Sequence, residues 1–114
     1  MYFERFRVIK PHEPEENEPL TLFAGEQLQY ERRPTEWEGW LWVKSKDGQT
    51  GWVPEAWVEI QGQFCSMTRD YDSTELEVDV GDYLHCLLIE SDWLWGEMPS
   101  GSTGWVPLEN LEQM

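Results

Sequence analysis

Short runs of alternating hydrophobic and polar residues follow one another along the chain. The runs are separated by Gly, Pro, Asp or Asn, and no stretch of useful length has helical periodicity. Because side chains alternate between the two faces of a strand, this pattern predicts an all-β chain with strands of about four to seven residues. The expected strands are 5–10, 25–32, 39–45, 50–54 and 57–60, and then 63–69, 81–89, 92–98, 103–107 and 110–112.

The second set of strands repeats the first. GWLWVKSKDGQTGWVPEAWV at 39–58 corresponds to DWLWGEMPSGSTGWVPLENL at 92–111, and EPLTLFAGEQL at 18–28 corresponds to TELEVDVGDYL at 74–84. Self-similarity over such a long period indicates two copies of one supersecondary unit. Five short strands in roughly 60 residues can bury a core only by closing into a barrel. With Gln61-Gly62-Gln63 as a short polar linker, the sequence predicts two tandem five-stranded barrels, one at residues 1–60 and one at 64–114.

Alternation also assigns the tryptophans to a face. Trp40 and Trp42 share one face of their strand, while Leu41 and Val43 share the other, and the second copy repeats this arrangement. We expect the aliphatic residues to fill the interior and the indoles to lie outside, with a three-residue loop centred on Gly48 pairing Val43 with Val53. Wide indoles on one outer face form an apolar patch, which usually marks a binding site. The alternative is that they cap the barrel and stabilise the sheet by packing on one another.

Several segments resemble a known family of small barrels. In the second copy, MTRDYDSTELEVDVGD, SDWLWGE and GSTGWVPLENLE resemble the ALYDY segment with its acidic loop, the tryptophan strand and the closing element of Src-homology-3 domains. In the first copy EPLTLFAGE, GWLWV and TGWVPEAWVEI fit the same family, with VIKPH in place of ALYDY. The chain thus resembles two variant, bacterial-type Src-homology-3 domains that together cover about residues 5–112. The resemblance implies an aromatic groove for a polyproline helix, beside an acidic loop that pairs with an Arg or Lys of the ligand.

The resemblance gives each copy its own ligand-binding residues. In the first copy they are Trp40, Trp52, Pro54 and Trp57, with His12 at a tyrosine position and Glu16 and Glu18 in the acidic loop. In the second copy they are Tyr71, Trp93, Trp105 and Pro107, with Asp72 and Glu75 in the acidic loop. The other departures from the family pattern are Lys10 in the first copy and Arg69 and Asn110 in the second. We expect Arg69 to repel a basic ligand from the second copy, which makes the first copy the stronger binder.

The chain is strongly acidic. Its 23 Asp and Glu against 8 Lys and Arg give a formal charge of −15, and most of the excess lies in the second half, whose only base is Arg69. Phosphate groups are bound by clustered Lys and Arg, so this balance argues against nucleic acid and against anionic membranes as partners. A protein or peptide with basic residues fits better, because opposite potentials steer association.

No motif of catalysis stands out. The two histidines, His12 and His85, have no metal-ligand spacing with Cys65 or Cys86, and the sequence contains no phosphate loop or nucleophile elbow. We therefore expect no enzyme activity, no metal and no cofactor. The start of the chain has no apolar run of signal-peptide length, which favours a cytoplasmic protein with reduced cysteines.

The sequence thus predicts a non-enzymatic adaptor, a monomer or weak dimer, that binds proline-containing or basic peptide segments through tryptophan-lined grooves. One alternative is a bacterial Src-homology-3 module that binds cell-wall peptide or another small ligand. Such relatives usually carry an export signal and an Asn-x-Arg-Ser-Gly segment, and neither is found in this sequence. The other alternative is a structural dimeriser that uses its tryptophan face to join two copies.

Overall fold

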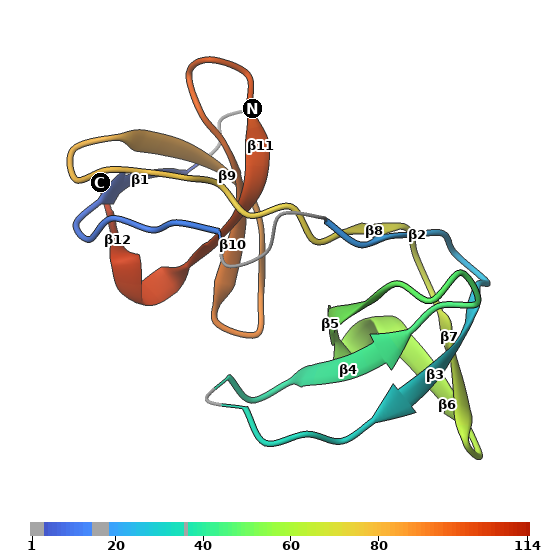
Figure 1. The fold of residues 1–114 in the computed structure, drawn as a ribbon. Helices are drawn as coiled ribbons and strands as arrows, with labels where there is room; N and C mark the ends of the chain where they lie inside the picture. The colour runs from blue at the N-terminus through green and yellow to red at the C-terminus, as the bar shows by residue number, and fades with distance from the viewer. Residues whose placement is uncertain (1–3, 15–18, 36) are drawn as a thin grey trace. The chain divides into compact units, whose positions relative to one another are not determined.

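The computed structural model describes residues 4–14, 19–35 and 37–114 (Figure 1). These residues form twelve β-strands and two three-residue 3-10 turns, so the all-β prediction is confirmed. No described segment forms a helix long and apolar enough to span a membrane.

Two compact units share the chain, and they differ in how the sequence builds them. Unit 2 is contiguous and comprises Pro19–Ser73. Unit 1 is discontinuous and comprises Met1–Glu18 and Thr74–Met114. Unit 2 is thus inserted into unit 1 along the sequence. The predicted division into residues 1–60 and 64–114 is therefore not the division that the structure has.

Unit 2 contains a five-stranded antiparallel sheet in the order β5-β4-β3-β7-β6. Its strands are β3 (Gln27–Glu31), β4 (Trp40–Lys44), β5 (Thr50–Pro54), β6 (Val58–Gln61) and β7 (Phe64–Met67), with the 3-10 turn η1 (Glu55–Trp57) between β5 and β6. A separate antiparallel pair joins β2 (Thr21–Leu22) to β8 (Tyr71–Asp72).

Unit 1 repeats this sheet in the order β11-β10-β9-β1-β12. Its strands are β1 (Arg5–Val8), β9 (Tyr83–Glu90), β10 (Trp93–Glu97), β11 (Thr103–Pro107) and β12 (Leu111–Gln113), with the 3-10 turn η2 (Leu108–Asn110) between β11 and β12. The strands of both units agree with those that the alternating pattern predicts, apart from their ends and the additional short pair β2 and β8.

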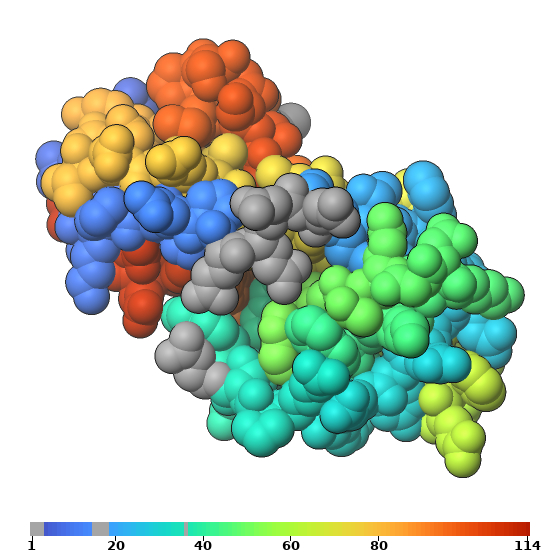
Figure 2. All heavy atoms as spheres, in the orientation of Figure 1, coloured from blue at the N-terminus to red at the C-terminus, as the bar shows by residue number. Residues whose placement is uncertain are grey.

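The first strands of the two sequence copies are exchanged. β1 belongs to the first copy but lies between β9 and β12 of the second copy, where Phe6 pairs with Leu84. In Figure 2 the blue residues of this segment lie against the gold residues of β9. β7 belongs to the second copy but lies between β3 and β6 of the first copy, where Cys65 pairs with Leu28. The predicted tandem arrangement, in which each copy closes on its own first strand, is therefore wrong.

The segment predicted as a linker is a hairpin turn inside unit 2. Gln61 pairs with Phe64, so Gly62 and Gln63 form the tight connection between β6 and β7. Gly62 has a φ of 64°, in the left-handed region that glycine adopts without steric cost. A polar glycine-containing segment is typical of a linker and of a turn alike, and the strand pairing on either side distinguishes them.

The aliphatic residues that the alternation turns inward are buried, but Pro54 and Trp105, which it turns outward, are buried as well. Leu41, Val43 and Val53 are at most 1% exposed in unit 2. In unit 1 the exchanged strand contributes Phe6 and Val8 to the core. Both residues pack in a cluster with Leu76, Val78, Leu84, Leu94, Val106 and Leu111.

The inward residues of the exchanged strands differ in size between the two units. β1 brings the bulky Phe6 to unit 1, at the place that Cys65 takes in unit 2. Along the repeat, unit 1 has Gly96 where unit 2 has the buried Val43. Each core thus combines one larger and one smaller residue at these two positions. At the next inward position the order of size is reversed, because β1 brings Val8 to unit 1 where β7 brings the larger Met67 to unit 2.

The register of β4 and β5 differs from the predicted one by two residues. Trp42 pairs with Trp52 and Leu41 with Val53, so the predicted pairing of Val43 with Val53 is wrong. The hairpin loop lies one residue earlier in the sequence than predicted. The hydrogen bond that closes it runs from the Ser45 amide to the Gln49 carbonyl, at 2.8 Å. A shift of two keeps every side chain on its face, which is why the inward and outward assignments remain correct.

Candidate functional site

An aromatic cluster with one arginine forms where the ends of β5, β7 and β8 meet in unit 2. The rings of Trp57 and Tyr71 lie edge to face, with centroids 5.8 Å apart and an interplanar angle of 83°. The guanidinium carbon of Arg69 lies 4.0 Å from the centroid of the Trp57 ring, within the range of a cation–π interaction. We call Trp57, Arg69 and Tyr71 the unit 2 cluster.

Hydrogen bonds hold the exchanged strand in place beside this cluster. Both the amide and the hydroxyl of Thr68 donate to the Trp57 carbonyl, at 2.8 and 2.9 Å. The Tyr71 hydroxyl donates to the Trp52 carbonyl at 2.9 Å, and a carboxylate oxygen of Asp70 accepts from the Ala24 amide at 2.9 Å. The residues on both sides of Arg69 are thus fixed to unit 2.

Three more tryptophans of unit 2 lie on the neighbouring hairpin of β4 and β5. Trp42 and Trp52 pack edge to face with centroids 5.2 Å apart, as expected for an aromatic cross-strand pair. Arg33 stacks over Trp42, with its guanidinium carbon 4.4 Å from the ring centroid. Trp40 pairs with Pro54, which is fully buried, while Trp40 and Trp52 are half-buried.

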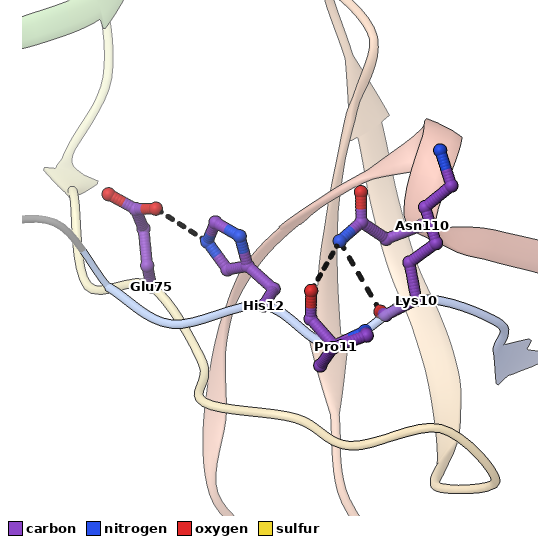
Figure 3. A network of polar contacts seen from close by, with 5 residues as sticks. All are labelled: Lys10, Pro11, His12, Glu75 and Asn110. Carbon is purple, nitrogen blue, oxygen red and sulfur yellow. Dashed lines mark hydrogen bonds and ion pairs between the residues drawn. The ribbon is translucent and has the colours of Figure 1, made fainter.

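The corresponding place in unit 1 is polar. The Asn110 side-chain amide donates to the Pro11 carbonyl at 3.0 Å and to the Lys10 carbonyl at 3.3 Å (Figure 3). His12 Nε2 and a Glu75 carboxylate oxygen are 2.7 Å apart. We call these five residues the unit 1 network. Asn110 is 7% exposed, so its two hydrogen bonds satisfy a buried amide.

The tryptophans of unit 1 lie beside this network. The His12 ring contacts Trp93 edge to face, with centroids 5.6 Å apart. Trp95 and Trp105 form a cross-strand pair with centroids 5.4 Å apart, like Trp42 and Trp52 in unit 2. Trp105 is only 3% exposed, so it contributes little surface to a ligand. Its backbone exchanges hydrogen bonds with Thr74 and Leu76, at 2.9 and 3.1 Å.

The exchange changes which of the expected site residues lie together. Unit 2 contains Trp40, Trp52, Pro54 and Trp57 of the first sequence copy together with Tyr71 and Asp72 of the second. Unit 1 contains His12 of the first copy together with Glu75, Trp93, Trp105 and Pro107 of the second. The predicted grouping of these residues by sequence copy is therefore wrong. Glu16 and Glu18 lie outside the described residues. The expectation that Arg69 stands in the groove of Trp93 is also wrong, because Arg69 stacks on Trp57.

Two contacts of these sites do not follow from the sequence pattern. The stacking of Arg69 on Trp57 and the hydrogen bonds of Asn110 both join residues of different sequence copies or of distant segments. The signal available was that Arg69 and Asn110 replace family tyrosines. That signal marks the positions but not their partners.

The fold and its aromatic sites define the class of protein. Two five-stranded antiparallel sheets with a 3-10 turn before the last strand of each copy are typical of SH3 (Src-homology-3) domains, which are protein-interaction modules that bind peptide partners. A family model described as the variant SH3 domain matches residues 5–61, and the chain belongs to this family. No curated protein and no solved structure matches the chain. The matched segment is one sequence copy, and the structure divides it between the two units.

Proposed function

We propose that the chain is a non-enzymatic adaptor that binds extended peptide segments containing proline and a basic residue, with unit 2 as the main binding unit. Family membership supports protein interaction in general. The observation that carries the finer proposal is the unit 2 cluster, where an aromatic ring already accepts a guanidinium. A surface that binds a cation of its own chain has the chemistry to bind one from a partner.

The charge of the chain supports the same ligand class. A net charge of −15 attracts basic segments over distances of about a Debye length, roughly 8 Å at physiological salt. A polyproline helix loses little conformational entropy on binding, so a small aromatic face is enough to hold it. Half-buried Trp40 would be the wall against which a proline packs, next to Pro54 in the sheet.

The two units should contribute unequally. Unit 2 offers Trp40 together with the unit 2 cluster, whereas unit 1 has Asn110 and His12 at the places of Trp57 and Tyr71. The Asn110 side-chain amide donates hydrogen bonds to two backbone carbonyls, and Asn110 has no aromatic ring to offer a ligand. We therefore assign the stronger peptide affinity to unit 2.

Titration with a synthetic PxxP peptide containing one arginine tests the proposal. We expect a dissociation constant that is roughly micromolar, corresponding to about −8 kcal/mol, and weaker binding at high salt. Trp40→Ala should weaken binding about thirtyfold, the typical cost of removing a central aromatic anchor. The matched variant Trp93→Ala should have the smaller effect. Affinity that is unchanged by Trp40→Ala, or indifferent to salt, would contradict the proposal.

A further inference from the structure

We propose that Arg69 is an internal occupant of the arginine-binding face of unit 2, so that a partner must displace Arg69 before its own arginine can bind there. The inference rests on the proposed function, because it names the anchor that a peptide partner would place on Trp57. It makes Arg69 the residue that sets the affinity and the specificity of unit 2.

Among the described residues, the guanidinium of Arg69 stacks on a ring and forms no ion pair with a carboxylate. Among the ion pairs of the described residues, Arg7, Arg32 and Arg33 each reach a glutamate, and Arg69 does not. The Arg69 guanidinium lies instead 4.0 Å from the centroid of the Trp57 ring. In a chain with 23 acidic residues this is informative, because the ring face holds the cation without an ion pair in the described structure.

Little of the Trp57 surface is exposed to solvent. Its side chain is 6% exposed, with the edge of Tyr71 on one side and Arg69 stacked on its face. Arg69 itself is exposed to solvent, so displacing it would uncover the ring without opening the core. The anchoring of Thr68 and Asp70 on either side means that the side chain can swing away while the backbone stays in place.

Unit 1 has different residues at both of the corresponding positions. Where unit 2 has Trp57 and Arg69, unit 1 has Asn110 and Lys10. Asn110 binds the Lys10 backbone carbonyl and has no ring on which a cation could stack. At these corresponding positions, unit 2 has a stacked cation and unit 1 does not. The stacking depends on the strand exchange, because Trp57 and Arg69 come from different sequence copies.

Two variants and one matched control test the occupancy. Arg69→Ala removes the internal cation, and Arg69→Lys keeps the charge on a side chain that stacks less well. Arg33→Ala is the control, because Arg33 also stacks on a tryptophan of unit 2, at 4.4 Å over Trp42, but outside the unit 2 cluster. Unchanged chemical shifts in unit 1 and cooperative unfolding would establish that each variant is folded.

The first probe is arginine methyl ester, followed by the chemical shift of the Trp57 indole. We expect Arg69→Ala to bind it at Trp57 at least fivefold more tightly than the wild type, with Arg69→Lys between them and Arg33→Ala equal to the wild type. This arm does not depend on proline recognition. Equal binding by wild type and Arg69→Ala, or no binding by either, would overturn the proposal.

The second probe is the arginine-containing PxxP peptide, with a peptide in which glutamine replaces the arginine as its counterpart. Arg69→Ala should bind the arginine peptide about fivefold more tightly than the wild type and the glutamine peptide with unchanged affinity. If both proteins bind the arginine peptide equally, the proposed function stands and Arg69 is not a competitor. If neither binds either peptide while the ester still binds Arg69→Ala more tightly, the peptide function fails and the occupancy stands.

Discussion

Unit 1 and unit 2 have the same strand order, yet the chain builds them differently. Unit 2 is one contiguous segment, while unit 1 is assembled from both ends of the sequence. Their sites differ as well: unit 2 has Trp57 and Tyr71 where unit 1 has Asn110 and His12. The comparison teaches that a sequence repeat and a structural unit need not coincide, and that each site combines residues from both repeats.

The largest effect should come from cutting the chain according to the two divisions. We expect the fragment 19–73 to fold, because it contains all five strands of the unit 2 sheet. The fragment 64–114 should not fold, because it lacks β1, the strand that joins β12 to the rest of its sheet. Thermal unfolding followed by near-ultraviolet circular dichroism would show a cooperative transition for the first fragment only.

The same fragments also test whether β7 can replace β1 in the sheet of unit 1. The fragment 64–114 still contains β7, which could take the place of β1. A cooperative transition for this fragment would mean that β7 can replace β1 in the sheet of unit 1. Adding a peptide of residues 4–14 in trans is the control, and we expect it to restore folding.

The second prediction compares the two exchanged strands at equivalent core positions. Phe6→Ala should destabilise unit 1 by about 3–5 kcal/mol, the usual cost of removing a buried phenylalanine. Cys65→Ala removes only one small group from unit 2 and should cost about 1 kcal/mol. Denaturant unfolding monitored by amide signals of each unit separates the two effects. Equal costs would show that β1 does not carry the larger share of its core.

Much of this fold could be predicted from the sequence, because strand positions and side-chain directions depend on the local sequence pattern. Alternation identified the strands and the inward positions of Leu41 and Val43, because side-chain direction depends only on neighbouring residues. The exchange could not be predicted in the same way. β1 and β7 have the same alternation, so either could complete either sheet, and the choice depends on three-dimensional packing.

The candidate site was predictable to a similar extent. The tryptophans of unit 2 could be identified from their strands, and Arg69 from its place in the repeat. Its stacking on Trp57 could not, because that contact exists only once β7 lies in unit 2. In our proposal, the expected repulsion of a basic ligand by Arg69 is replaced by competition for the Trp57 ring of the same unit.

The third prediction concerns the glycine that precedes the tryptophan of each GWVP segment. A Cβ on Gly104 would lie 2.9 Å from Leu76 Cγ and 3.0 Å from the Thr74 carbonyl oxygen, which is part of the backbone. On Gly51 the nearest atom would be Leu20 Cδ2 at 3.2 Å, the end of a side chain. Gly104→Ala should therefore cost about 1–3 kcal/mol, as overpacking usually does, and Gly51→Ala clearly less. Urea unfolding of the two variants would measure both, and a larger cost at Gly51 would reverse the comparison.

The smallest effect should come from the thiols, one in each unit. Burial raises the pKa of the Cys65 thiol above its ordinary value of 9.0, and burial and the nearby Glu4 carboxylate raise the pKa of the Cys86 thiol. A raised pKa in the folded state means that the unfolded chain loses its proton first as the pH rises. The stabilisation is therefore complete below pH 9 and is lost as the pH rises through the folded pKa. Cys65→Ala should flatten the decline in unfolding free energy above pH 9, measured by urea unfolding against the wild type.

Because Cys65 is fully buried and Cys86 half-buried, iodoacetamide should also modify Cys86 faster in the folded protein. Faster modification of Cys65 would mean that β7 leaves its sheet more readily than β9, which would make unit 2 the less stable of the two.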